Sequence, residues 1–151
     1  MIKTVFKITI GSLMVMFFLD LSLFAIDFFQ TESKIKNLGE VIQKQVIQNN
    51  SIPPEQLTIY NQITDDIKKQ SMKNNVDTIE IKMIDKTTGN EKLNLSQPEE
   101  YGSVYTLQIA TQYRPARIFF PWVADGQRRI LRKNGVVTRH NYTTPCLRYL
   151  Q

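Results

Sequence analysis

The chain has few of the residues on which most enzyme sites depend. Cys146 is its single cysteine and His140 its single histidine among 151 residues. One cysteine excludes an internal disulfide, and one histidine leaves almost no basis for a histidine-ligated metal site. No glycine-rich phosphate loop is present, and Cys146 and His140 lack an evident third group to orient them as a catalytic pair. We therefore expect no enzyme activity, cofactor or metal, and Cys146 either pairs between molecules or is a buried apolar thiol.

The most informative feature that is present is a long apolar run over residues 8–29, ITIGSLMVMFFLDLSLFAIDFF. About 20 apolar residues suffice for a helix to cross a bilayer. A signal peptidase that cut after Ala25 would find Leu23 at its −3 position, where a small residue is preferred. The sequence therefore predicts a retained membrane span rather than a cleaved signal.

Charges before this span predict its orientation. Lys3 and Lys7 precede the run, and basic residues favour the cytoplasmic side. The abundance of Lys, Asn and Ile is typical of an AT-rich bacterium. We expect a single-pass protein of the bacterial cytoplasmic membrane, with a cytoplasmic N-terminus and an extracytoplasmic C-terminal domain.

Two acids interrupt the span, Asp20 and Asp27. They are seven residues apart and so share one helical face, and a carboxylate inside a membrane is costly. Three interpretations stay open: pairing with Lys3 or Lys7 of a neighbouring copy, snorkelling to water, or a proton or ion pathway. Pairing Lys7 with Asp20 or Asp27 needs a stagger of about 20 or 30 Å between parallel helices.

Periodicity predicts two helices. Ile35, Leu38, Ile42 and Val46 continue the helical spacing beyond the membrane, which predicts one helix over residues 3–48. Asn49, Asn50, Ser51 and two prolines end it. A second helix is predicted over residues 54–73, with proline at its start and an apolar stripe of Tyr60, Ile63 and Ile67.

The remainder reads as antiparallel strands. Alternation of apolar and polar residues predicts strands over 76–85 and 103–113, and Asn134-Gly135 predicts a hairpin between 127–133 and 136–143. The fold class is therefore α+β. Residues 1–50 form a transmembrane and amphipathic helix, and residues 51–151 form an extracytoplasmic head.

The C-terminal part is strongly basic. All seven arginines follow residue 113, where Asp125 is the only acid. Basic and aromatic residues side by side suit single-stranded nucleic acid, or they contact acidic patches of another subunit such as Asp65 and Asp66. The candidate contact residues are Arg114, Arg117, Trp122, Arg128, Arg129 and Arg132.

Two stretches carry a family resemblance, FFLDLSLFAIDFFQTESKIKNLGEVIQKQV and YGSVYTLQIATQYRPARIFFPWV. With the N-terminal apolar helix and C-terminal sheet, they resemble the pilin superfamily, and within it TadE-like pseudopilins. Many pilins carry Glu at the fifth mature position after peptidase cleavage. Cleavage at Gly11-Ser12 would place Met16 there, so the resemblance implies that Asp20 or Asp27 supplies the acid.

The resemblance implies a structural subunit that polymerises through its N-terminal helix into a surface filament or pseudopilus. Its partners would be other copies of itself, the membrane before assembly, and proteins of the assembly machinery. The alternatives are a bitopic accessory protein of a secretion or conjugation machine, and a nucleic-acid-binding minor pilin that contacts DNA.

Overall fold

The computed structural model describes residues 1–71, 75–114 and 135–148. Within these residues two helices, α1 (Ile2–Asn49) and α2 (Pro54–Gln70), precede three strands, β1 (Val76–Asp85), β2 (Val104–Tyr113) and β3 (Val136–Pro145). The strands form one antiparallel sheet in the order β1-β2-β3. This is the α+β layout expected from the sequence, with a long N-terminal helix, a short second helix and a small sheet.

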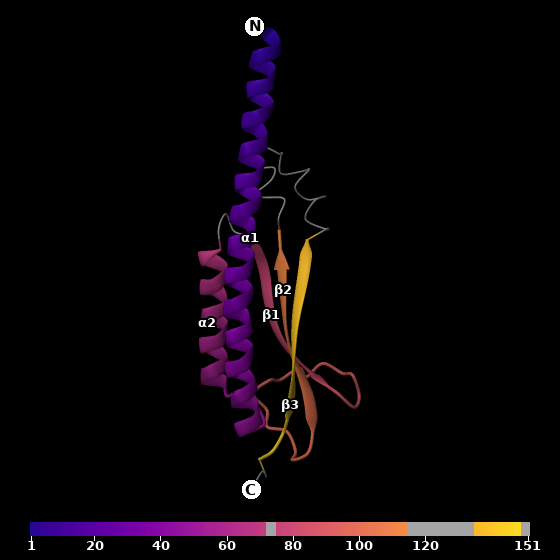
Figure 1. Ribbon diagram of the computed structural model, residues 1–151. Coiled ribbons are helices and arrows are strands. Elements are labelled where there is room, and N and C mark those ends of the chain that lie inside the picture. The colour runs from indigo at the N-terminus through magenta and orange to yellow at the C-terminus, as the bar shows by residue number, and fades with distance from the viewer. Residues whose placement is uncertain (72–74, 115–134, 149–151) are drawn as a thin grey trace.

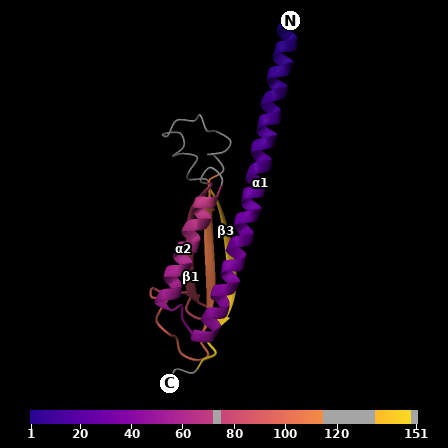
Figure 2. The ribbon, with the colours of Figure 1, turned by 90° about the vertical axis from the view of Figure 1, so that its left-hand side faces the viewer.

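Helix α1 has two halves with different surroundings. Its 48 residues span about 70 Å at 1.5 Å per residue. The N-terminal half projects beyond the head, whereas the C-terminal half lies along the sheet with α2 beside it (Figures 1 and 2). The buried stripe of this second half is Asp27, Thr31, Ile35, Leu38, Gly39, Ile42 and Val46.

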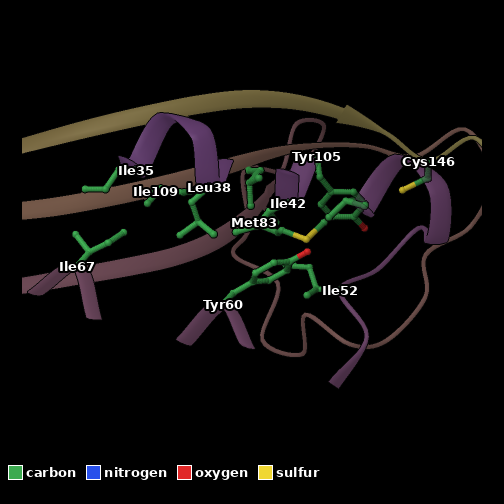
Figure 3. Close-up of a cluster of buried hydrophobic side chains, with 12 residues drawn as sticks. Ile35, Leu38, Ile42, Ile52, Tyr60, Ile67, Met83, Tyr105, Ile109 and Cys146 are labelled. Atoms are coloured by element: carbon green, nitrogen blue, oxygen red, sulfur yellow. The ribbon is translucent and has the colours of Figure 1, made fainter. Parts of the chain in front are cut away.

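The hydrophobic core lies between the two helices and the inner face of the sheet. Every second residue of β2 is buried, from Tyr105 to Tyr113, as its alternating pattern predicts. Met83 of β1 and Tyr60 of α2 complete the cluster with the apolar stripe of α1, as Figure 3 shows. The second half of α1 is thus part of the head in packing, although it precedes residue 50 in the chain.

The helix ends follow from local chemistry. Asn50 adopts a left-handed conformation with φ of 54°, a common way to end a helix. Its side chain donates to the carbonyls of Glu99 and Arg148 and accepts from the backbone N–H of Arg148. Asn50 therefore ties the end of α1 to the C-terminal tail.

Apart from the end of α2, the predicted helices and strands agree with the structure over the described residues. α2 ends at Gln70 because Ser71 is extended, so the helix predicted to residue 73 stops earlier. β3 pairs with β2. The strand predicted over residues 127–133 lies outside the described residues.

Candidate functional site

The exposed N-terminal half of α1 is the most unusual surface of the molecule. α1 is long and apolar enough to cross a membrane, and none of its most apolar window is buried within the chain. Between residues 2 and 26 each of the following side chains is at least 40% exposed: Ile2, Val5, Phe6, Ile8, Ile10, Leu13, Met14, Val15, Met16, Phe17, Phe18, Leu19, Leu21, Leu23 and Ile26.

The size of this apolar surface decides what its environment must be. Burial of one large apolar side chain contributes about 1.5–3 kcal/mol, so leaving this set in water costs on the order of tens of kcal/mol. A whole domain is stable by only about 5–15 kcal/mol. This apolar segment must therefore be buried in lipid or against other protein chains.

The predicted intersubunit residues fall in two different settings. Lys3 and Lys7 are exposed on the projecting half of α1, and Asp20 is partly buried. Asp27 belongs to the buried stripe of α1 that faces the head and is only 5% exposed. Its carboxylate accepts a hydrogen bond of 2.8 Å from Asn75 Nδ2, so a lysine of a second copy would have to displace a contact inside the chain to reach it.

Glu32, which has no distinguishing signal in the sequence, is the centre of the junction between α1 and the sheet. Its Oε1 accepts hydrogen bonds from the Tyr113 hydroxyl at 2.5 Å and from Thr138 Oγ1 at 2.8 Å. Its Oε2 lies 2.5 Å from His140 Nε2, where the ring N–H donates to the carboxylate. One carboxylate of α1 therefore joins β2 and β3.

These contacts change the protonation equilibria of the junction. Burial favours the neutral form of Glu32, but hydrogen bonds from Tyr113, Thr138 and His140, with the charge of His140, outweigh it and lower the pKa of Glu32. Burial, and then the hydrogen bond and charge of Glu32, raise the pKa of Tyr113. At neutral pH the pair is a carboxylate and a neutral phenol, which is the combination that hydrogen-bonds best.

Aromatic contacts hold α1 on either side of Glu32. The rings of Phe28 and Tyr113 lie 4.8 Å apart. The Tyr142 hydroxyl donates at 3.1 Å to the carbonyl of Lys36, which lies one helical turn after Glu32. Its ring lies so close to Gly39 that a Cβ there would come within 2.6 Å of ring atoms. Residues 28–39 of α1 are thus fixed against the sheet.

Most of the residues proposed for nucleic acid or subunit contact lie outside the described residues, namely Arg117, Trp122, Arg128, Arg129 and Arg132. Arg114 is described. Its side chain is 13% exposed and forms an ion pair with Asp77 of β1. A guanidinium placed in this way holds the end of β2 to β1 rather than facing outward.

Residues suited to chemistry do not converge in the described part of the chain. Cys146 is buried in the core, and burial is the main cause that raises the pKa of its thiol. His140 lies six residues earlier, about 20 Å away along an extended strand, and contacts Glu32. Among residues 1–71, 75–114 and 135–148 no group of three or more His, Cys, Asp or Glu side chains could hold a metal ion.

Comparison of the chain with protein-family models, with curated proteins and with solved structures gave no match in any of the three. The class of protein is therefore defined by its own layout, an α+β head carried on a helix whose first half is long and apolar enough to cross a membrane.

Proposed function

We propose that this chain is a pilin-like structural subunit that is anchored in a membrane by α1 and assembles through that helix into a filament or pseudopilus. The observation that carries the proposal is the division of α1. One half is exposed and apolar, while the other is built into the core of the head. A rigid helix continuous with a folded head can move from lipid into contact with neighbouring helices without unfolding of the head.

The junction at Glu32 supports this role. An assembly that pulls or packs the helix transmits force to the head through residues 28–39. Charge-assisted hydrogen bonds such as those on Glu32 are about twice as strong as neutral ones. The head and the helix therefore behave as one rigid piece, which a structural subunit needs.

The predicted orientation has Lys3 and Lys7 on the cytoplasmic side and the head outside the cell. Within the assembly, Lys7 is available for pairing with Asp20 of a neighbour. Asp27, which is bonded to Asn75, serves the head. Replacement of Asp20 by Leu should then reduce assembly, whereas replacement of Asp27, which removes the contact with Asn75, should first destabilise the head.

In-cell crosslinking with an amine-reactive reagent tests the proposal, because exposed lysines lie on both parts of the chain: Lys3, Lys7, Lys34, Lys36, Lys44, Lys69 and Lys86. Membrane fractions should give a ladder of self-crosslinked products. A single band with another protein would favour the bitopic accessory protein instead, and recovery of the full chain as a water-soluble monomer would contradict the proposal.

A further inference from the structure

The head begins on α1 before the apolar run of that helix ends. The run covers residues 8–29, yet Asp27 already accepts a hydrogen bond of 2.8 Å from Asn75. The ring of Phe28 lies 4.8 Å from that of Tyr113, the last residue of β2. The apolar segment therefore runs directly into the folded head within one continuous helix.

The length of the apolar run places these contacts at the surface of the membrane. The hydrocarbon core of a bilayer is about 30 Å thick, or about 20 helical residues, and each headgroup layer adds about 5–7 Å. Lys7 is the last cation before the run. With Lys7 at the inner boundary, the hydrocarbon core ends at about residue 27 and the outer headgroup layer covers about four further residues. The first contacts between α1 and the head lie at this outer boundary.

One end of the sheet lies at the same level and exposes apolar side chains. β2 ends and β3 begins at the end of the head from which the N-terminal half of α1 projects (Figures 1 and 2). Val136 pairs with Tyr113, whose ring contacts Phe28. Val136 is 48% exposed and Val137 is 45% exposed, and Phe29 at the end of the apolar run is 70% exposed. We call Phe29, Val136 and Val137 the apolar rim.

We propose that the apolar rim rests in the headgroup layer of the membrane that anchors α1, so that the head makes a second contact with lipid. This contact depends on the proposed function, because it needs α1 to lie in a membrane before assembly. Lipid is the occupant because the rim and the span belong to one rigid piece. The depth of the span in the bilayer therefore fixes the depth of the rim.

The charged side chains next to the rim do not oppose contact with lipid phosphates. Asp77 forms an ion pair with Arg114, and the Glu32 carboxylate accepts hydrogen bonds from β2 and β3. Lys34 is exposed and lies five residues after Phe29, about 7 Å further along α1. The acids beside the rim are thus occupied within the head, and an exposed cation lies just outside it.

The contact would control the orientation of the head. A single span leaves a molecule free to tilt in the bilayer. The apolar rim comes from two elements, with Phe29 on α1 and the two valines on β3. Contact of both elements with the membrane surface holds the head upright, so that all copies present the same face to their neighbours before assembly.

Lipid quenching of a fluorescent label on the full chain in vesicles tests the contact. Val137→Cys is compared with Thr143→Cys, since both are exposed positions of β3. Their even spacing places both side chains on one face of the strand, about 20 Å apart. The vesicles contain phosphatidylglycerol and phosphatidylethanolamine, some of which carry a nitroxide on the headgroup. The native Cys146 is buried, and the unsubstituted chain reports its background labelling.

A second matched pair lies on α1. Phe29→Cys and Val41→Cys each replace an exposed apolar residue, and the two positions are about 18 Å apart along the helix. Headgroup nitroxides should quench the labels at residues 29 and 137 at least about threefold more than those at residues 41 and 143, because the headgroup layer is so thin. A label on Met16→Cys should be quenched by lipids that carry the nitroxide at the end of the acyl chain.

The possible results separate the rim contact from the proposed function. Equal quenching at residues 137 and 143, with the label at residue 16 quenched, would overturn the rim contact and leave the proposed function standing. A label at residue 16 that lipid does not quench would show that α1 does not enter the bilayer. That result would overturn both the rim contact and the proposed function.

Discussion

Removal of the Glu32 carboxylate is the most direct perturbation of the junction between helix and head. In Glu32→Ala the Tyr113 hydroxyl loses its carboxylate acceptor, and Tyr113 is only 1% exposed. Thr138 and His140 are partly exposed and can turn toward water. An unsatisfied buried donor costs about 1–3 kcal/mol, and a hydrogen bond to a charged group is worth about 1.5–3 kcal/mol. We expect a loss of about 2–4 kcal/mol in the free energy of unfolding.

The assay is urea unfolding of the full chain in detergent micelles, followed by near-ultraviolet circular dichroism of the tyrosines. Glu40→Ala is the control, because Glu40 is an exposed acid on the same helix and the change in helix propensity is the same. Its cost should stay within about 0.5 kcal/mol. The variant Tyr113→Phe completes a double-mutant cycle, in which we expect a coupling of about 1 kcal/mol or more. Equal losses for Glu32→Ala and Glu40→Ala would refute the reasoning.

Three further predictions concern the contacts of Glu32, Gly39 and Asn50. The pKa of Glu32 is lowered from 4.5, so its ionised form stabilises the head above that pH, and this stability is lost as the pH falls through the folded pKa. Urea midpoints measured between about pH 3 and 6 should therefore depend less on pH in Glu32→Gln than in the wild-type chain, and identical slopes would contradict this. Gly39→Ala should destabilise the wild-type chain by displacing the Tyr142 ring, yet it should stabilise a Tyr142→Ala chain by about 0.5–1 kcal/mol through helix propensity. Thermal melts of the four chains test this, and a change in stability of the same sign in both backgrounds would disprove the contact. Asn50→Gly keeps the left-handed backbone but loses three hydrogen bonds, so it should cost about 2 kcal/mol and speed proteolysis of the C-terminal tail, and an unchanged urea midpoint would argue against it.

The elements of the fold could be predicted because their periodicity is strong. The alternation of β2 from Tyr105 to Tyr113 and the helical spacing from Ile35 to Val46 both match the buried positions. In a half-buried strand the buried residues recur every two positions, and in a half-buried helix about every 3.6 positions, so both patterns can be recognised in the sequence. The end of α1 was equally visible, because Asn50 tolerates the left-handed conformation that ends a helix.

The helical spacing of the sequence also indicates that Asp27 faces the head. Asp27, Thr31 and Ile35 are four residues apart, so they extend the head-facing stripe of α1 toward the N-terminus. Considered only as the partner of Asp20, seven residues earlier, Asp27 belongs to the membrane span. Considered with the stripe, it belongs to the head, where it meets Asn75.

The role of Glu32 could not be predicted in this way. Its partners Tyr113, Thr138 and His140 are 81 to 108 residues away in the chain. Their meeting depends on the register of β2 with β3 and on the rotation of α1 over the sheet. An isolated glutamate on a helix has no local signal for such contacts.

The central claim is that the exposed half of α1 leaves the membrane to be covered by copies of the same chain. Electron microscopy of purified surface material, labelled with an antibody to the head, tests it most directly. The account predicts filaments labelled along their whole length, and fewer of them on cells whose chain carries Asp20→Leu. Surfaces without labelled filaments, with the chain remaining a dispersed membrane protein under the same conditions, would contradict it.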